Sequence, residues 1–392
     1  MRFAQRTQDP APIRVLVDAV ALAARPGSGA ARYCQALLPR LSAVRGLDLR
    51  LLDRGGGEAL KGVPAASRIP FPMVHASWSG PADSALIQRV CDHYDIDVVL
   101  GSLWTTPLRT PLVTIVQDMV AELRGLSPTH PCEREKDLAL TYAARLLCPS
   151  EETRDDLVSL WPARPAETVR IAPAWVDAGR WSRASRGHIT AFRQAHGLSR
   201  AYILCLGAPY VPDPGEPLAA TLAAVRQADP GPVDILCVGQ VPDALRAEAG
   251  ARVTFLDPGP GLDLAAAYSG AMALSFPVAR AGAALPVLDA MACGCPVVTT
   301  AAGASDKQTA EAVAMVPADT PGALATALAR LASEPRQRKG LIRRGKARAG
   351  AMGWRGSVEV VTDTIREVAT APADRAFHDE WTRLRTLQSR FL

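Results

Sequence analysis

The chain has 392 residues, of which 48% are hydrophobic and 21% are charged. This composition supports a sizeable buried interior, so it excludes a disordered or fibrous protein, and the length is typical of two domains. The formal net charge of +5 is too small to indicate a nucleic-acid partner.

In the first half of the chain, short β-branched runs alternate with helical stretches. Strands are predicted at residues 13–19, 47–53, 98–101, 110–118, 145–149 and 169–173, with helices at 30–44 and 82–94. Continuous apolar strands separated by helices indicate a parallel sheet that is covered on both faces.

The alternation stops at residues 177–198, which are rich in Gly, Arg and Ser, and then resumes. Strands are predicted at residues 202–207, 233–239, 252–257, 272–277 and 297–300, and helices at 217–228, 262–271, 285–293, 321–333, 337–352 and 357–369. We therefore expect an α/β protein with two doubly wound Rossmann-like domains that face each other across a cleft. The expected domains are residues 1–180 and 199–355, with a linker at 181–198.

The C-terminal residues 356–392 are expected to form helices that cross back to the first domain. Within them, Trp381, Leu384, Leu387 and Phe391 recur at helical spacing and form one apolar stripe. Docking of this stripe on the protein's own surface is the simpler interpretation, and contact with a membrane or a partner protein is the alternative.

The opening residues lack the apolar stretch of a secretory signal peptide. The longest mostly apolar stretch, 281–304, contains Asp289 and two prolines, so it does not predict a membrane span. We therefore expect a soluble cytoplasmic protein. A basic stretch at 336–348 favours a solvated helix, with peripheral contact at the inner face of the membrane as the alternative.

The eight cysteines do not follow the spacing of metal ligands. Only Cys293 and Cys295 are close together, and a Cys-x-Cys pair alone is a weak signal for zinc or redox chemistry. We expect neither a bound metal ion nor a cofactor.

Two turns of small residues are candidate ligand sites, because ligands of open parallel sheets bind beyond the carboxyl ends of the strands. The first turn places Gly29 at the start of a helix, where the amides either hold an anion or form a structural turn. In the second turn, Gly282, Ala283 and Ala284 precede a helix that starts near Pro286. This arrangement leaves free amides and room for a flat polar ligand.

The second turn and its helix, residues 276–298, resemble the donor-binding motif of GT-B retaining glycosyltransferases of the family-4 type (glycosyl transferases group 1). That motif usually reads Glu-Gly-Phe-Gly-Leu-Pro-x-x-Glu-Ala-Met-Ala-x-Gly-x-Pro-Val. Six further anchors follow in the order of the family: Gly-Ala-Ala-Arg-Tyr at 29–33, Val-Thr-Ile-Val-Gln-Asp at 113–118, Cys-Pro-Ser at 148–150, the strand at 202–207, the segment at 262–276, and Trp354.

The resemblance implies a GT-B fold, retention of the anomeric configuration and no requirement for a metal. It also implies that the donor is a nucleotide-sugar, linked to UDP or GDP. The implied acceptor is a cell-surface polysaccharide, a lipopolysaccharide or a related glycan or lipid-linked molecule.

This sequence departs from the family motifs at positions that contact the donor in the family. The first glutamate of the motif maps to Ala281, which removes a carboxylate, and the second maps to Asp289, which is still able to accept hydrogen bonds from a ribose. The histidine expected near the donor sugar maps to Gln117. The loop at 208–225 contains no Arg or Lys, where the family places a cation that stabilises the departing diphosphate.

Other residues are candidates to replace these groups. Arg280 precedes Ala281, and Arg32 lies one turn into the first long helix. In this hypothesis Arg280 or Arg32 supplies the positive charge, and Gln117 and Asp118 lie at the reaction centre. The plainer interpretations are that the arginines are solvated and that Gln117 and Asp118 cap a helix or turn.

Three functions are compatible with these observations. The first is an active glycosyltransferase, which we take as the prediction. The second is a catalytically degenerate homologue that acts as a binding or partner subunit of another glycosyltransferase, which the substitutions at Ala281 and Gln117 favour. The third, a two-domain sugar-nucleotide epimerase, explains the architecture but not the six anchors.

Overall fold

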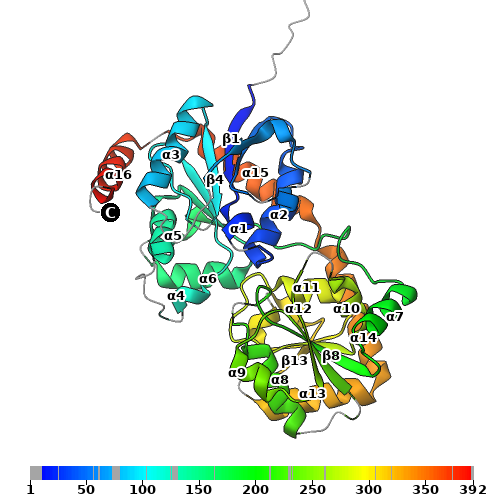
Figure 1. Ribbon diagram of the computed structural model, residues 1–392. Helices are drawn as coiled ribbons and strands as arrows, with labels where there is room; N and C mark the ends of the chain where they lie inside the picture. Colours follow the sequence, from blue (N-terminus) through cyan, green and yellow to red (C-terminus); the bar gives the residue numbers. More distant parts are fainter. Residues whose placement is uncertain are drawn as a thin grey trace, which may run out of the picture.

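A computed structural model describes residues 11–389 except for 25, 56, 61, 73–79, 103, 124, 126–130, 163, 212, 228–230, 232, 260–261, 305, 319 and 373. Two α/β domains face each other, and the C-terminal helices return to the first of them (Figure 1). This arrangement confirms the predicted fold class of two parallel-sheet α/β domains.

The first domain is built on a seven-stranded parallel sheet in the order β3-β2-β1-β4-β5-β6-β7. Its strands are β1 (Ile13–Asp18), β2 (Leu47–Asp53), β3 (Arg68–Pro70), β4 (Val98–Ser102), β5 (Leu112–Ile115), β6 (Arg145–Cys148) and β7 (Val169–Ile171). The strand order reverses between β1 and β4, which is where doubly wound sheets bind ligands.

The second domain repeats this plan with a six-stranded parallel sheet in the order β10-β9-β8-β11-β12-β13. Its strands are β8 (Ala201–Leu206), β9 (Val233–Val238), β10 (Val253–Leu256), β11 (Ala273–Phe276), β12 (Val297–Thr299) and β13 (Ala314–Met315). The short edge strands β3 and β13 were not predicted.

Helices cover both faces of each sheet. In the first domain they are α1 (Val20–Ala24), α2 (Gly29–Leu41), α3 (Gly80–His93), α4 (Val120–Leu123), α5 (Pro131–Tyr142) and α6 (Glu151–Leu160). The second domain has α7 (Arg186–Ala195), α8 (Glu216–Gln227), α9 (Asp243–Glu248), α10 (Leu264–Gly270), α11 (Leu285–Ala292), α12 (Lys307–Ala310), α13 (Pro321–Ser333) and α14 (Pro335–Ala351). The chain ends with α15 (Trp354–Thr370) and α16 (Arg375–Gln388), and short 3-10 turns occur at Gly57–Leu60, Ala65–Ser67, Ala166–Thr168 and Ala301–Ala304.

The segment predicted as a linker at 181–198 is instead part of the second domain. Its middle forms α7, which packs against α10. Trp181, Phe192 and Leu198 are buried in the core of that domain. Most residues of α7 are polar and exposed, which hid this helix from the sequence prediction, whereas Phe192 is buried and Ile189 is half-buried.

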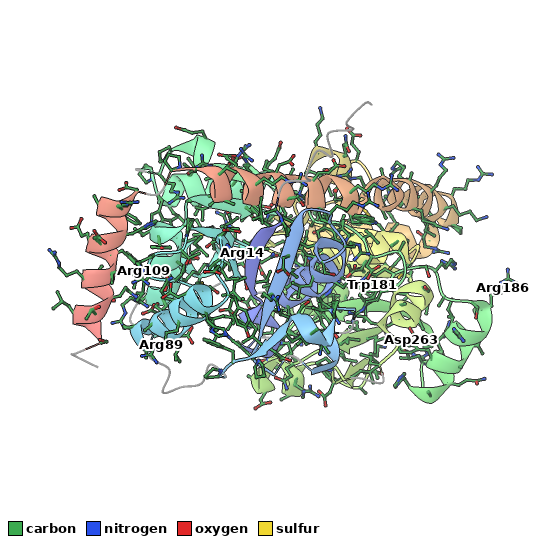
Figure 2. The ribbon with its side chains drawn as sticks, turned by 90° about the horizontal axis from the view of Figure 1, so that it is seen from above. Arg14, Arg89, Arg109, Trp181, Arg186 and Asp263 are labelled. Atoms are coloured by element: carbon green, nitrogen blue, oxygen red, sulfur yellow. The ribbon has the colours of Figure 1, made fainter. Side chains whose placement is uncertain are left out.

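The helix α15 leaves the second domain and packs along α2 and the strands β4 to β7 of the first. Val358, Val361, Ile365 and Val368 recur every three or four residues and enter the core of the first domain. Seen from above, α16 lies at the outer end of the first domain near Arg109, whereas Arg186 marks α7 at the opposite end of the molecule (Figure 2).

The apolar stripe predicted for the tail does not dock as one surface. Trp381 is buried, but Leu384 and Leu387 are 41% and 46% exposed, and Phe391 lies outside the described residues. Arg385 occupies the inward face instead and is 1% exposed.

Within the described part of the chain, no helix is long and apolar enough to cross a membrane. The described residues also contain no group of three or more His, Cys, Asp or Glu side chains that is placed to hold a metal ion.

Candidate active site between the two domains

A cavity of about 460 Å³ lies where the carboxyl ends of the two sheets face each other. Both domains contribute to its wall. Of the predicted site residues it brings together six: Gly29, Arg32, Gln117, Asp118, Ala283 and Ala284.

The first domain contributes the N-terminus of α2 to the cavity. Ser28 caps this helix by accepting a hydrogen bond from the amide of Ala31 at 3.2 Å. At Gly29, a Cβ would come within 3.9 Å of Leu285 in the second domain. The 13-residue helix therefore presents its positive end to the cavity at a point where the domains approach closely.

The second domain contributes the N-terminus of α11, which no side chain of the described residues caps. Ala284 adopts a left-handed conformation with φ of 47°, which costs about 1–2 kcal/mol for a residue with a Cβ. Such a conformation persists where the surrounding fold imposes it, and it often marks a functional site. Here it turns the chain so that Ala283 and Ala284 line the cavity.

Gly282 lies at the contact between the domains and not in the cavity wall. Its φ is 55°, and an added Cβ would lie 2.7 Å from the carbonyl oxygen of Gln117 and 2.8 Å from Cβ of Asp118. Ser150 also donates to the Gly282 carbonyl oxygen at 3.4 Å. Only a glycine fits this position, because both the backbone angle and the space exclude a side chain.

Two buried polar side chains in the cavity wall have no hydrogen-bond partner among the described residues. Gln117 is 7% exposed and neither end of its amide is paired, and the hydroxyl of Thr114 is 2% exposed and unpaired. A buried polar group without a partner costs about 1–3 kcal/mol. The wall is therefore prepared for a polar ligand.

The neighbour of Gln117 has a structural contact. Asp118 accepts a hydrogen bond from the amide of Val120 at 3.2 Å, so its carboxylate caps α4. It is the one acidic residue among the described residues that line the cavity. Asp118 therefore both caps a helix, as the plainer interpretation expected, and lines the cavity.

Lys136 is a cavity residue that the sequence did not indicate. Its ammonium group donates to the carbonyl oxygen of Asp118 at 3.2 Å and lies 2.6 Å from the carboxylate of Glu122. Trp104 and Tyr210 are further lining residues that were not predicted. All three come from segments without a motif, so no signal in one sequence distinguishes them from ordinary helix and loop residues.

Arg32 and Asp289, both predicted to contact the donor, pair with each other across the domain boundary. The guanidinium of Arg32 on α2 bonds to the carboxylate of Asp289 on α11. Both side chains are buried, and Arg32 also lies 5.1 Å from the ring centre of Trp181. Burial raises the pKa of Asp289 to about 6, against the opposing effect of Arg32.

The expected contact of Asp289 with a ribose stays a prediction, and the pairing with Arg32 limits how it could form. Its carboxylate is not in the wall of the main cavity but in that of a smaller hollow of about 240 Å³, beside Arg40, Arg180 and Trp181. A ribose hydroxyl would therefore have to compete with Arg32 for the carboxylate.

Arg280 also departs from its predicted position. It does not line the cavity, its side chain is 43% exposed, and its guanidinium lies 3.1 Å from the carboxylate of Asp156 on α6. Burial raises the pKa of neighbouring Glu152 to about 7, and Arg280 opposes that shift. The guanidinium of Arg280 therefore lies beside Asp156 and Glu152 on α6, and this contact holds it outside the cavity.

Two family models match the chain, one in each domain. Residues 27–180 match Glycosyltransferase Family 4, and residues 200–334 match Glycosyl transferases group 1. A D-inositol 3-phosphate glycosyltransferase of Saccharomonospora viridis is 30% identical over 305 residues, which cover 71% of this chain and 70% of that protein. A protein of the same name from Salinispora tropica is 28% identical, and the match covers 70% of this chain but only 63% of that protein.

Solved structures show the same fold at low sequence identity. Anabaena HepE in complex with UDP and glucose superposes with a TM-score of 0.71 at 16% identity, covering 91% of this chain and 100% of that one. WaaG, a glycosyltransferase involved in lipopolysaccharide biosynthesis, gives a TM-score of 0.69 at 17% identity, covering 90% of this chain and 99% of that one. The two-domain arrangement is therefore that of GT-B glycosyltransferases.

Proposed function

The chain belongs to the family-4, group 1 glycosyltransferases, and from that premise we propose that it transfers a sugar from a nucleotide-sugar donor to a hydroxyl group of an acceptor. The single observation that carries the proposal is the cavity between the domains. It is lined by the ends of two helices and by buried polar groups on Gln117 and Thr114 that have no partner within the described part of the chain. Such a wall suits a ligand that is both anionic and rich in hydroxyl groups.

The diphosphate of the donor is placed between the N-termini of α2 and α11. Both helix ends carry partial positive charge, and neither needs to reorganise when negative charge develops on the leaving group. Arg32 adds a guanidinium to the wall, where it also pairs with Asp289. This distribution replaces the single basic residue that the loop at 208–225 lacks.

We propose that the reaction retains the anomeric configuration. The resemblance of residues 276–298 to the donor-binding motif of retaining glycosyltransferases supports this stereochemistry. The bond from the anomeric carbon to the phosphate oxygen breaks, and the acceptor oxygen bonds to the same face. The acceptor proton passes to the leaving diphosphate, which thereby serves as the base.

The acceptor is a polyhydroxylated molecule that enters along the first domain. Polysaccharides, lipopolysaccharides and lipid-linked glycans belong to this class, as does D-inositol 3-phosphate, which appears in the names of the curated relatives. Lys136 and Trp104 offer a cation and an aromatic surface on that side of the cavity.

Calorimetry with UDP and GDP, followed by assays of diphosphate release from the corresponding sugar nucleotides, tests this function. We expect Gln117→Ala to lower turnover about tenfold or more, the effect of losing one hydrogen bond in the transition state. Gln227→Ala, at an exposed glutamine on α8, is the matched control and should behave as wild type.

If neither diphosphate binds at millimolar concentration, the enzyme proposal fails. The degenerate partner subunit then remains, and it predicts that the chain raises the activity of another glycosyltransferase when the two are mixed.

A further inference from the structure

The C-terminal helix α16 inserts an arginine into the interior of the first domain. Arg385 is 1% exposed and binds Glu135 of α5 through two hydrogen bonds, of 2.6 Å and 3.1 Å. The guanidinium also donates to the hydroxyl of Ser84 on α3 at 2.9 Å. One side chain therefore joins three helices that are far apart in the sequence, and the forked pairing fixes their orientation.

The space for this ion pair depends on a glycine. A Cβ at Gly80, the first residue of α3, would lie 2.1 Å from the carboxyl carbon of Glu135. The carboxylate thus fills the gap between α3 and α5, and Arg385 closes that gap from the outside.

The same helix holds the loop that follows β4. Trp381 donates from its indole nitrogen to the carbonyl oxygen of Pro107 at 3.2 Å, and Thr382 donates to that of Leu108 at 3.3 Å. Thr106 lies in the same loop and shares a hydrogen bond of 2.8 Å with Ser84.

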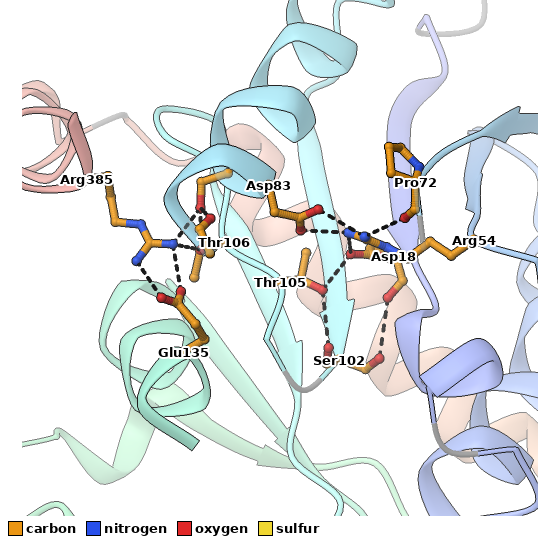
Figure 3. A network of polar contacts seen from close by, with 11 residues as sticks. Asp18, Arg54, Pro72, Asp83, Ser102, Thr105, Thr106, Glu135 and Arg385 are labelled. Atoms are coloured by element: carbon orange, nitrogen blue, oxygen red, sulfur yellow. Dashed lines mark hydrogen bonds and ion pairs between the residues drawn. The ribbon is translucent and has the colours of Figure 1, made fainter. Parts of the chain in front are cut away.

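A second buried arginine extends this network to the centre of the sheet. Arg54 forms forked hydrogen bonds to Asp83 on α3 and to Asp18 at the end of β1, with distances between 2.8 and 3.0 Å. Thr105 also donates to Asp18 at 3.0 Å. Figure 3 shows the two arginine-centred groups on either side of α3.

Two members of this network are adjacent in the sequence to residues that line the cavity. Glu135 is followed by Lys136, and Thr105 is preceded by Trp104. Because neighbouring residues on a helix differ by a fixed rotation, the bond from Arg385 to Glu135 sets the direction in which Lys136 points.

Lys136 in turn contacts the carbonyl oxygen of Asp118, another residue that lines the cavity, and the carboxylate of Glu122. We propose that α16, through Arg385, positions the acceptor half of the site, namely Lys136 and Trp104, and so controls the binding of the acceptor. This inference rests on the proposed function, because it assigns the first-domain side of the cavity to the acceptor. Arg385 is a positioning residue, since it touches α5 and α3 and not the cavity itself.

The test compares Arg385→Met, Arg385→Lys and the control Arg383→Met, which alters an exposed residue of the same helix. We expect Arg385→Met to raise the KM for the acceptor about tenfold. This is the effect of losing one hydrogen bond between the acceptor and a displaced Lys136. The Kd for the nucleoside diphosphate should not change. Arg385→Lys keeps the charge without the fork and should recover part of the loss, and it carries the test if the methionine variant folds poorly.

A readout that needs no enzymatic activity is the rate at which a lysine-acylating reagent modifies Lys136, followed by mass spectrometry. We expect faster modification in Arg385→Met and Arg385→Lys than in Arg383→Met. Equal modification rates in all three variants, or an equal loss of donor and acceptor binding, would overturn the inference. In that case α16 would only pack on the first domain and would not position the site.

Failure of the proposed function is distinguishable from this outcome. In that case the wild type binds no nucleoside diphosphate, whereas the labelling of Lys136 still reports whether α16 positions α5.

Discussion

The molecule contains two buried pairs between an arginine and a carboxylate that differ in what they connect. Arg32 and Asp289 join the two domains beside the cavity, whereas Arg385 and Glu135 join the C-terminal helix to the first domain. The first pair can separate when the domains move apart, with each domain still folded. The second can separate only if α16 leaves its place.

The two ion pairs therefore have different effects, because one joins two domains and the other joins helices within one domain. An ion pair at a domain interface couples ligand binding to domain movement, because the ligand competes for the same charges. An ion pair inside a domain is a weak source of stability, since desolvation offsets the attraction, but removing one partner leaves a buried charge. The following variants separate these two cases.

The largest effect is expected at Arg385. Arg385→Met leaves Glu135 buried without its cation, which costs about 3–5 kcal/mol of unfolding free energy. Denaturant titration of the full chain measures this loss. Replacing both residues by methionine should recover most of it, and a double variant no more stable than Arg385→Met would show that packing of α16, not charge, matters.

The next effect is a dependence of stability on pH through Asp289. Its pKa is raised to about 6 in the folded chain, against about 3.9 in an unfolded one. Between these values the folded state binds more protons, so the contribution of Asp289 favours folding below pH 4 and is lost as the pH rises to about 6. The full change is on the order of 3 kcal/mol.

Thermal unfolding of wild type and Asp289→Asn between pH 4 and pH 7 measures this contribution. The difference between the two curves should change across the interval and become constant above it. Parallel curves over the whole range would show that Asp289 does not titrate there.

A smaller effect is expected at the contact between the domains. Gly282→Ala forces a Cβ to within 2.7 Å of the Gln117 carbonyl oxygen and imposes a left-handed alanine, at a cost of about 1–2 kcal/mol for the backbone alone. The domains should separate slightly, which weakens diphosphate binding about tenfold by calorimetry. Gly350→Ala, where an added Cβ meets nothing within 4 Å, is the control.

The smallest effect is expected at Arg280. The side chain of Arg280 in its contact with Asp156 is 43% exposed, and exposed ion pairs contribute about 0–1 kcal/mol. Arg280→Ala should therefore leave turnover within about twofold of wild type. A loss of a hundredfold would restore Arg280 to the catalytic role that its place in the motif suggested.

Much of the fold followed from local patterns. Continuous apolar strands predicted the two parallel sheets, because a strand that is buried on both faces is apolar along its whole length. Helix α7 was missed because its outer face is polar, and the predicted stripe on α16 proved misleading because Arg385, not Leu384, faces inward. Periodicity reports which residues share a face, but not which face is buried.

The sequence by itself determined the family, the two-domain architecture and part of the cavity wall, including Gly29, Gln117 and Ala284, since these depend on motifs at strand ends and helix starts. Only the tertiary structure decided which charges meet. It paired Arg32 with Asp289, directed Arg280 to Asp156, and brought Lys136 to the cavity. The physical reason is that electrostatic partners are set by distances of a few ångströms between segments that lie apart in the sequence, by 257 residues for Arg32 and Asp289, and no local pattern encodes such distances.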